Sequence, residues 1–214
     1  PATMKYHFID TCFGTHHPQF GYDADNTLWF SGTGQVAGWV NTRIWDETGD
    51  VQKAQGWAPF VLDINGNGKL DEWTDAGKSA EPGKDTRINP GSGPYAVMPH
   101  PTDGSVWYTV GVFAGRPGFM RFDPNTKLSE FYAVPKEAIG LRGGDIDKDG
   151  VLWGSGSSGH LIAFDRRKCK APLNGPNAAG VHCPEGFTLH RYPGPGFFGF
   201  EQYSAEAGYY TWVD

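Results

Sequence analysis

The stretch that decides the fold reads Asp-Gly-Val-Leu-Trp at residues 149–153 and, after a run of glycines and serines, Gly-His-Leu-Ile-Ala-Phe-Asp at residues 159–165. The Asp-Gly pair predicts a tight turn, and the apolar residues around Trp153 predict a strand. The glycine-rich run predicts a reversal into a second strand that ends at Asp165. Together these residues predict an antiparallel hairpin.

The same phrase occurs twice earlier in the chain. Asp-Gly-Ser-Val-Trp at residues 103–107 leads to a strand pattern that closes at Asp123, and Asp-Asn-Thr-Leu-Trp at residues 25–29 leads to one that closes at Asp46. A repeated unit with a period of about 40 to 50 residues is typical of β-propeller blades. Because one tryptophan recurs at the same place in each unit, we expect it on the second strand, filling the space between neighbouring sheets.

The predicted fold class is all-β: a β-propeller sector of three four-stranded blades plus parts of flanking blades, within a larger propeller. Its segments follow in chain order: blade one at about 15–62, an insertion at 63–93, blade two at about 94–135, blade three at about 139–193, and the start of a next blade at 197–214. Both ends look as if they lie inside a larger protein, so the remaining blades are expected from the same or another chain. No helix of useful length is predicted.

Composition narrows the classes of function. The chain has 31 glycines and 16 prolines with 14% aromatic residues, which fits strands joined by many turns. Its net charge of −6 without long charge runs argues against nucleic acid or an anionic membrane as partner. No segment approaches the roughly 18 apolar residues of a membrane span. The sequence also lacks a nucleophile elbow, a phosphate loop and a dinucleotide motif.

Two of the three cysteines, Cys169 and Cys183, flank a loop without strand pattern. We expect a disulfide between them, closing a loop of about 15 residues and contributing about 3 kcal/mol in the loop-entropy model. Such a bond indicates an oxidising, extracytoplasmic compartment, periplasmic or secreted. The alternative is a pair of free or metal-binding thiols beside His182. Cys12 is left over and is expected to be buried, unless its partner lies elsewhere.

A family resemblance rests on residues 118–126, Gly-Phe-Met-Arg-Phe-Asp-Pro-Asn-Thr, and residues 131–135, Phe-Tyr-Ala-Val-Pro, after an Asp-Gly and an apolar-Trp pair. This pattern resembles the repeats of virginiamycin B lyase (streptogramin lyase) propellers, also found in large bacterial secreted proteins with a carboxypeptidase-regulatory-like domain. It covers roughly residues 15–214. The resemblance implies a seven-bladed fold and a metal-assisted elimination that opens a cyclic peptide ester. The motifs specify the blade, and no residue of the lyase site can be matched one by one.

Candidate catalytic or ligand-binding residues lie at the starts of the predicted innermost strands, where several blades converge on the axis. They are His16, His17, Tyr95, Arg142 and Glu201, with Tyr203 beside the last. Histidine can act as a base or metal ligand, arginine can hold an anion, and tyrosine can donate a proton. The alternative is that His-His-Pro only forms a turn before a strand.

The insertion contains a candidate calcium site. Its ligands would be Asp63, Asn65, Asn67, Lys69 and Asp71, with Gly68 at the sixth position, where a calcium loop turns sharply. Position twelve is Thr74, so a bidentate ligand would come from Glu72, Asp75 or a distant residue. The calcium would be structural. An Asn-Gly-rich turn without metal is the alternative.

Two functions remain open. The first is an extracytoplasmic propeller that binds a small-molecule or protein ligand at its axial face, within a larger secreted or periplasmic assembly. The alternative is a streptogramin-lyase-like, metal-assisted lyase or hydrolase. A shared pocket for His17, Tyr95 and Arg142 would favour an enzyme, and a channel filled with apolar side chains would favour a scaffold.

Overall fold

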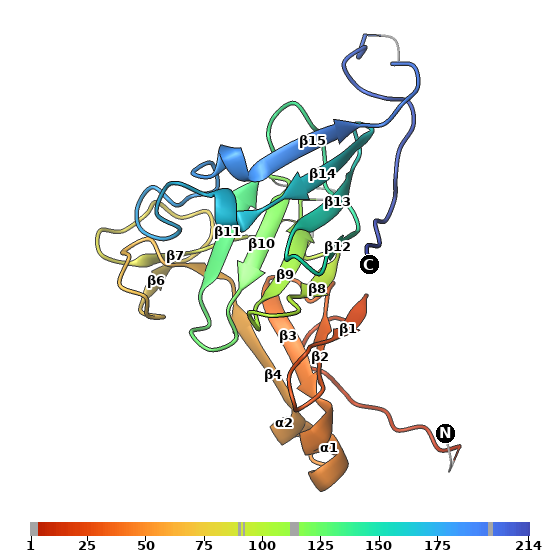
Figure 1. Cartoon of the computed structure of the whole chain (residues 1–214). Helices are drawn as coiled ribbons and strands as arrows, with labels where there is room; N and C mark the ends of the chain where they lie inside the picture. The colour runs from red at the N-terminus through yellow and green to blue at the C-terminus, as the bar shows by residue number, and fades with distance from the viewer. Residues whose placement is uncertain (1–3, 90, 92, 112–115, 197–198) are drawn as a thin grey trace.

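A computed structural model describes residues 4–89, 91, 93–111, 116–196 and 199–214. The chain is mostly β, as predicted, with several antiparallel sheets (Figure 1). Sheet one contains four strands in chain order, β1 (Pro18–Phe20), β2 (Thr27–Phe30), β3 (Val36–Asn41) and β4 (Gln55–Pro59). Each of these strands is antiparallel to the next.

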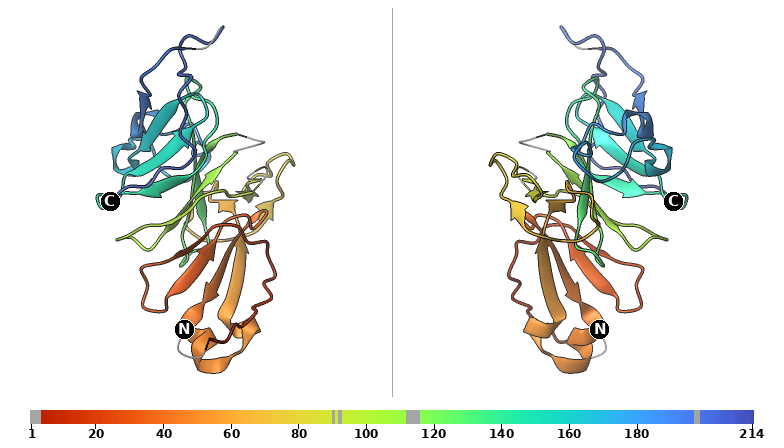
Figure 2. Two further views of the ribbon diagram at one scale, coloured as in Figure 1. Left: turned by 90° about the vertical axis from the view of Figure 1, so that its right-hand side faces the viewer. Right: turned by 90° about the vertical axis from the view of Figure 1, so that its left-hand side faces the viewer.

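The same antiparallel order recurs twice more. Sheet two is built on β8 (Val97–Pro99), β9 (Val106–Val110), β10 (Gly118–Phe122) and β11 (Ser129–Ala133). Sheet three consists of β12 (Gly144–Ile146), β13 (Leu152–Gly156), β14 (His160–Phe164) and β15 (Phe187–Arg191). Figure 2 shows the three sheets one after another along the chain.

The repeated phrase determines the register of each sheet. The turn between first and second strands has a residue with positive φ at Asn26 (49°), Gly104 (74°) and Gly150 (79°), a conformation that favours Asn and Gly. Three residues later comes the tryptophan of the second strand. Trp29 lies opposite Trp39, Trp107 opposite Arg121, and Trp153 opposite Ala163 on the third strand. The predicted equivalence of the three tryptophans is confirmed.

Aromatic contacts join each sheet to the next. The ring of Trp29 lies 6.0 Å from that of Phe122 in sheet two, and the ring of Trp107 lies 6.1 Å from that of Phe164 in sheet three. Trp29 and Trp107 are buried, whereas Trp153 is half-buried and stacks on His190 of its own sheet. The first strand of sheet two, β8, lies beside the first strands of both neighbouring sheets, β1 and β12.

Sheet one departs from the prediction after its third strand. Residues 42–46 were expected to continue the strand to Asp46, but they begin α1 (Thr42–Thr48), which is followed by α2 (Val51–Ala54). Asn41 caps α1, since its side-chain oxygen accepts a hydrogen bond from the backbone N–H of Ile44 at 2.9 Å. In sheets two and three, Asp123 and Asp165 lie two residues after the residue that pairs with the tryptophan. Asn41 holds this position in sheet one.

The insertion adds strands to sheet two. Blade one was expected to run to about residue 62, but β4 ends at Pro59 and β5 (Val61–Leu62) pairs in parallel with β11 of sheet two. Two further short strands, β7 (Asp85–Arg87) and β6 (Trp73–Thr74), extend this edge. Proline has no backbone N–H to continue the ladder, which explains the break after β4.

Two segments near the chain ends form no strand. Residues 4–13 form no strand, and the ring of Phe13 packs against Gly38 of β3. Residues 197 and 198 of the expected next blade lie outside the described residues, and residues 199–214 contain no strand. They fold back onto sheet three, where Gly143 donates its N–H to the carbonyl of Tyr209 at 3.2 Å.

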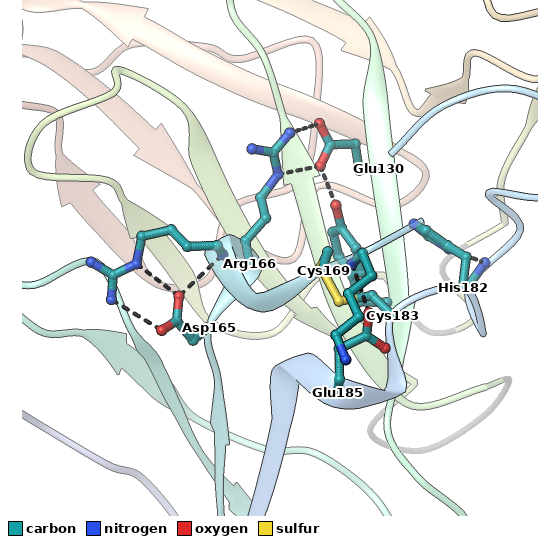
Figure 3. The surroundings of a disulfide bond; sticks show 11 residues. Glu130, Asp165, Arg166, Cys169, His182, Cys183 and Glu185 are labelled. Atoms are coloured by element: carbon teal, nitrogen blue, oxygen red, sulfur yellow. Dashed lines mark hydrogen bonds and ion pairs between the residues drawn. A yellow bond between two sulfur atoms is a disulfide. The ribbon is translucent and has the colours of Figure 1, made fainter. Parts of the chain in front are cut away.

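The predicted disulfide between Cys169 and Cys183 is present, with their Cα atoms 5.0 Å apart (Figure 3). It closes the loop between two short 3₁₀ helices, η1 (Arg166–Lys168) and η2 (Pro184–Gly186). Cys12 is free, as expected, but it is exposed and not buried. Among the described residues, no helix is both long and apolar enough to cross a membrane.

Candidate functional site

The backbone places the predicted site residues at equivalent positions just before β1, β8 and β12. His16 donates its N–H to the carbonyl of Ser31 at 2.9 Å, Tyr95 to Thr109 at 2.8 Å, and Arg142 to Ser155 at 2.8 Å. These acceptors are themselves equivalent. Ser31, Thr109 and Ser155 each follow the tryptophan of their sheet by two residues. The three side chains therefore start from the same edge of adjacent sheets.

The two histidines and Tyr95 form an aromatic cluster. The rings of His16 and His17 are 4.1 Å apart, and Tyr95 lies 5.5 Å from His16 and 5.2 Å from His17. The hydroxyl of Ser31 accepts the N–H of His17 at 3.0 Å and helps to position it. The predicted neighbours from two separate sheets thus meet in space.

Two tyrosines from the C-terminal segment join the cluster. The hydroxyls of Tyr95 and Tyr209 form a hydrogen bond of 2.5 Å, and the guanidinium of Arg142 lies 5.1 Å from the centre of the Tyr209 ring. The ring of Tyr210 lies 5.6 Å from that of His17. Tyr209 therefore links Arg142 to Tyr95, which contacts both histidines. We name these six residues the His-Tyr-Arg cluster: His16, His17, Tyr95, Arg142, Tyr209 and Tyr210.

The structure places Glu201 elsewhere. This residue lies in an exposed turn and contacts Gly196, while Tyr203 is buried with its ring 6.3 Å from His160. Tyr209 and Tyr210 were not among the predicted site residues, because their contacts require residues 199–214 to fold back over sheet three. The adjacent pair of tyrosines was visible in the sequence, but its place in space was not.

Burial sets the protonation of the cluster. It lowers the pKa of His17, and the neighbouring His16 lowers that pKa further. Burial, with the hydrogen bond to Tyr209 adding, raises the pKa of Tyr95 to about 12. Burial also raises the pKa of Tyr210 to about 12, with the charge of Asp145 adding. At neutral pH the cluster therefore offers a neutral His17 and protonated Tyr95 and Tyr210 beside the guanidinium of Arg142.

One atom of the cluster lacks a partner. Nε2 of His17 is buried and makes no hydrogen bond within the described part of the chain. A buried polar atom without a partner costs about 1 to 3 kcal/mol. A ligand that donates to or accepts from this nitrogen would recover part of that energy.

A cavity lies at the opposite end of these strands. It has a volume of about 430 Å³ and lies between sheets one and two near the Asp turns, lined by residues that include Asp23, Thr27, His100 and Ser105. Its walls hold no member of the His-Tyr-Arg cluster. The cluster and this cavity are therefore separate features.

The predicted calcium residues form one loop at the edge of sheet two. Asp63 is buried at the centre, and the chain from Asn65 to Asp71 folds around it. In residues 4–89, 91, 93–111, 116–196 and 199–214, no group of three or more His, Cys, Asp and Glu side chains is placed to hold a metal ion. A cation here would need amide and carbonyl oxygens as well as carboxylates.

Comparison with known proteins gave no match to a family model, to a curated protein or to a solved structure. Function is therefore inferred from the arrangement of residues. Among these residues, the His-Tyr-Arg cluster combines a cation, protonated hydroxyls and an unpartnered imidazole nitrogen. Such a set can bind an anionic group and exchange a proton.

Proposed function

We propose that the chain is a sector of an extracytoplasmic β-propeller that binds a ligand at its axial face through the His-Tyr-Arg cluster. Three features support the propeller. Four-stranded antiparallel units recur in the same register, each tryptophan of the first two sheets contacts the next sheet, and the first strands lie side by side. Further sheets would come from the same or another chain, within a larger secreted or periplasmic assembly.

The disulfide supports the proposed compartment. A cross-link between Cys169 and Cys183 persists in oxidising surroundings and is rare in the cytosol. The exposed thiol of Cys12 is compatible with such a compartment only if it stays unreactive or finds a partner. A periplasmic or secreted location fits the first observation best.

The observation that carries the binding function is the unpartnered Nε2 of His17 beside the Tyr95–Tyr209 pair and Arg142. Arginine binds carboxylates with two parallel hydrogen bonds, and the tyrosine hydroxyls and the imidazole can bond to neighbouring oxygens. The ligand class that fits is a small molecule or a protein segment that presents a carboxylate next to further polar groups.

The alternative function is a lyase of the streptogramin type. Its support is that a neutral His17 can accept a proton while the protonated Tyr95 can donate one, which is the pair of roles that an elimination requires. A cyclic depsipeptide such as virginiamycin B would then be opened without change of mass. Incubation with magnesium followed by chromatography and mass spectrometry would reveal a linear product of equal mass.

The binding function is tested with citrate as a carboxylate probe, by calorimetric titration of the full chain. We expect His17→Ala and Arg142→Ala to weaken binding at least about tenfold, equivalent to about 1.4 kcal/mol. Their melting temperatures should stay nearly unchanged, because residues at the edge of the sheets contribute little packing.

Glu201→Ala is the matched control, since this exposed carboxylate lies away from the cluster and should leave citrate binding unchanged. Equal citrate binding by all variants would contradict the assigned site. A large fall in melting temperature for His17→Ala with unchanged binding would show that the cluster is structural.

A further inference from the structure

The Asp63 loop, residues 63–71, is folded around one buried carboxylate. The side chain of Asp63 accepts backbone N–H groups from Gly66 at 2.6 Å, Asn67 at 3.1 Å and Gly68 at 2.9 Å. Gly66 and Gly68 have positive φ values of 78° and 73°, which let the chain turn tightly enough to reach it. The loop is therefore organised with a negative charge at its centre.

A second buried carboxylate lies against this loop. Asp85, the first residue of β7, is fully buried, and its Oδ1 accepts the N–H of Ile64 at 3.1 Å and of Asn65 at 3.4 Å. Its Oδ2 is buried as well and has no hydrogen-bond partner within the described residues. One oxygen of Asp85 is thus held by the start of the Asp63 loop, and the other is left without a partner.

No ion pair among the described residues involves Asp63 or Asp85. The basic residues that flank Asp85 pair elsewhere, Lys84 with Glu72 and Glu81, and Arg87 with Asp75. The carboxylate of Asp63 accepts hydrogen bonds from its own loop and from Asn174, but Oδ2 of Asp85 accepts none among the described residues. A buried carboxylate without full compensation is strongly unfavourable, and a bound cation is one of the ways in which proteins remove this cost.

We propose that the Asp63 loop binds a calcium ion and that Asp85 supplies the carboxylate missing from position twelve of the loop. Since the described residues bring no three carboxylates together, the other oxygens would come from Asp63, Asn65, Asn67 and the main-chain carbonyl of Lys69, without Asp71. Calcium accepts six to eight oxygen ligands in irregular geometry, whereas magnesium requires near-ideal octahedra and zinc prefers nitrogen and sulfur. This proposal is independent of the binding function of the His-Tyr-Arg cluster.

The amide ligands are available in the present fold. Oδ1 of Asn65 accepts the N–H of Asn67 at 3.0 Å, and Oδ1 of Asn67 accepts the N–H of Lys69 at 2.9 Å. Each amide oxygen has a second lone pair that can face a cation. The carboxylate of Asp71 accepts a hydrogen bond from the side-chain amide of Asn67, within the same loop.

The ion would also clamp the disulfide-closed loop to the insertion. Asn174, between the two bonded cysteines, donates its side-chain N–H to Oδ2 of Asp63 at 3.1 Å, and Gly175 donates its N–H to the Asp63 carbonyl at 2.7 Å. Fixing Asp63 with a cation therefore fixes a contact between sheets two and three. Loss of calcium should loosen both loops together.

The test is calorimetric titration and thermal unfolding of the full chain with calcium, magnesium or EGTA. We expect one calcium bound per chain and a melting temperature about 5 °C or more higher at saturating calcium than in EGTA, with a smaller rise in magnesium. Asp85→Asn keeps the shape and the Oδ1 acceptor but removes the charge. It should abolish the calcium-dependent rise, and in EGTA it should melt no lower than the natural chain.

Asp149→Asn is the control, because this exposed aspartate lies in the hairpin turn of sheet three and pairs only with Lys148 among the described residues. It should keep the full response to calcium. If Asp85→Asn fails to fold, the site is tested in the natural chain with terbium. Excitation of Trp73 should give terbium emission, and this emission should fall when calcium displaces terbium. Equal melting in calcium and EGTA without binding heat would overturn the site, and normal calcium binding by Asp85→Asn would overturn the role of Asp85.

Discussion

At the scale of single residues, Glu130 is a half-buried charge that joins two sheets. Its carboxylate accepts two hydrogen bonds of 2.7 Å from the guanidinium of Arg166 and one of 2.5 Å from the hydroxyl of Tyr132 (Figure 3). Arg121 approaches it at 3.3 Å. Glu130 belongs to sheet two and Arg166 follows the third strand of sheet three, so this ion pair joins two sheets.

Replacing Arg166 tests this ion pair. The side chain of Glu130 is only 15% exposed, so removing its bidentate partner leaves a poorly solvated carboxylate. We expect Arg166→Ala to lower the free energy of unfolding by about 2 kcal/mol, measured by urea denaturation. The remaining contact between Glu130 and Arg121 makes this loss smaller.

Lys148→Ala is the control. Its ammonium pairs with Asp149, and both side chains are exposed, at 78% and 64%, so this surface pair contributes less than about 1 kcal/mol. A loss for Arg166→Ala no larger than for Lys148→Ala would show that the Glu130 pair does not stabilise the contact between sheets.

At the scale of elements, the loop between Cys169 and Cys183 stands apart from the strands. Residues 170–182 form no helix or strand, since η1 ends before Cys169 and η2 begins after Cys183, and the middle of the loop is held by Asn174 and Gly175 on Asp63. Such a loop has little secondary structure to limit its freedom in the unfolded chain. The cross-link supplies that limit.

Removing the disulfide should therefore be costly. We expect the double variant Cys169→Ser, Cys183→Ser to lose about 3 kcal/mol of unfolding free energy, the value that the loop-entropy model assigns to about 15 residues. Urea denaturation measures it, with Cys12→Ser as control, because Cys12 is exposed and unbonded. A double variant as stable as Cys12→Ser would mean that native contacts alone hold the loop.

At the scale of the whole molecule, stability depends on aromatic packing from sheet to sheet. Trp107 lies between sheets two and three, stacked on Tyr132 at 5.8 Å and in contact with Phe164. Trp153 holds the same register in sheet three, yet it is only half-buried, and its indole N–H donates to Asp147 at 2.8 Å. Equivalent residues thus have unequal surroundings.

Paired substitutions measure this difference. Trp107→Ala should lower the free energy of unfolding by about 3 to 5 kcal/mol, because it leaves a cavity between two sheets. Trp153→Ala should cost less than about 2 kcal/mol, since part of its surface already faces solvent. Chemical denaturation of both variants decides the point, and equal losses would contradict the outward position of Trp153.

The sequence by itself determined the local structure of the sheets and the disulfide. Asp-Gly and Asp-Asn pairs predicted the turns, the tryptophans predicted the register, and Cys169 and Cys183 predicted the cross-link. These features depend on neighbouring residues, since positive φ values and alternating strand faces are local properties. The starts of the first strands followed from that register, so His16, Tyr95 and Arg142 were found at equivalent positions.

Only the tertiary structure decided which distant segments meet. The crossing of β5 to sheet two, the fold-back of Tyr209 and Tyr210 onto the cluster, and the placement of Asp85 beside Asp63 all join residues far apart in the chain. Helix α1 replaced an expected strand because Asn41 caps its first turn, a local alternative that strand patterning did not distinguish. Contacts between distant segments depend on how whole sheets pack, and residue spacing carries no direct record of that packing.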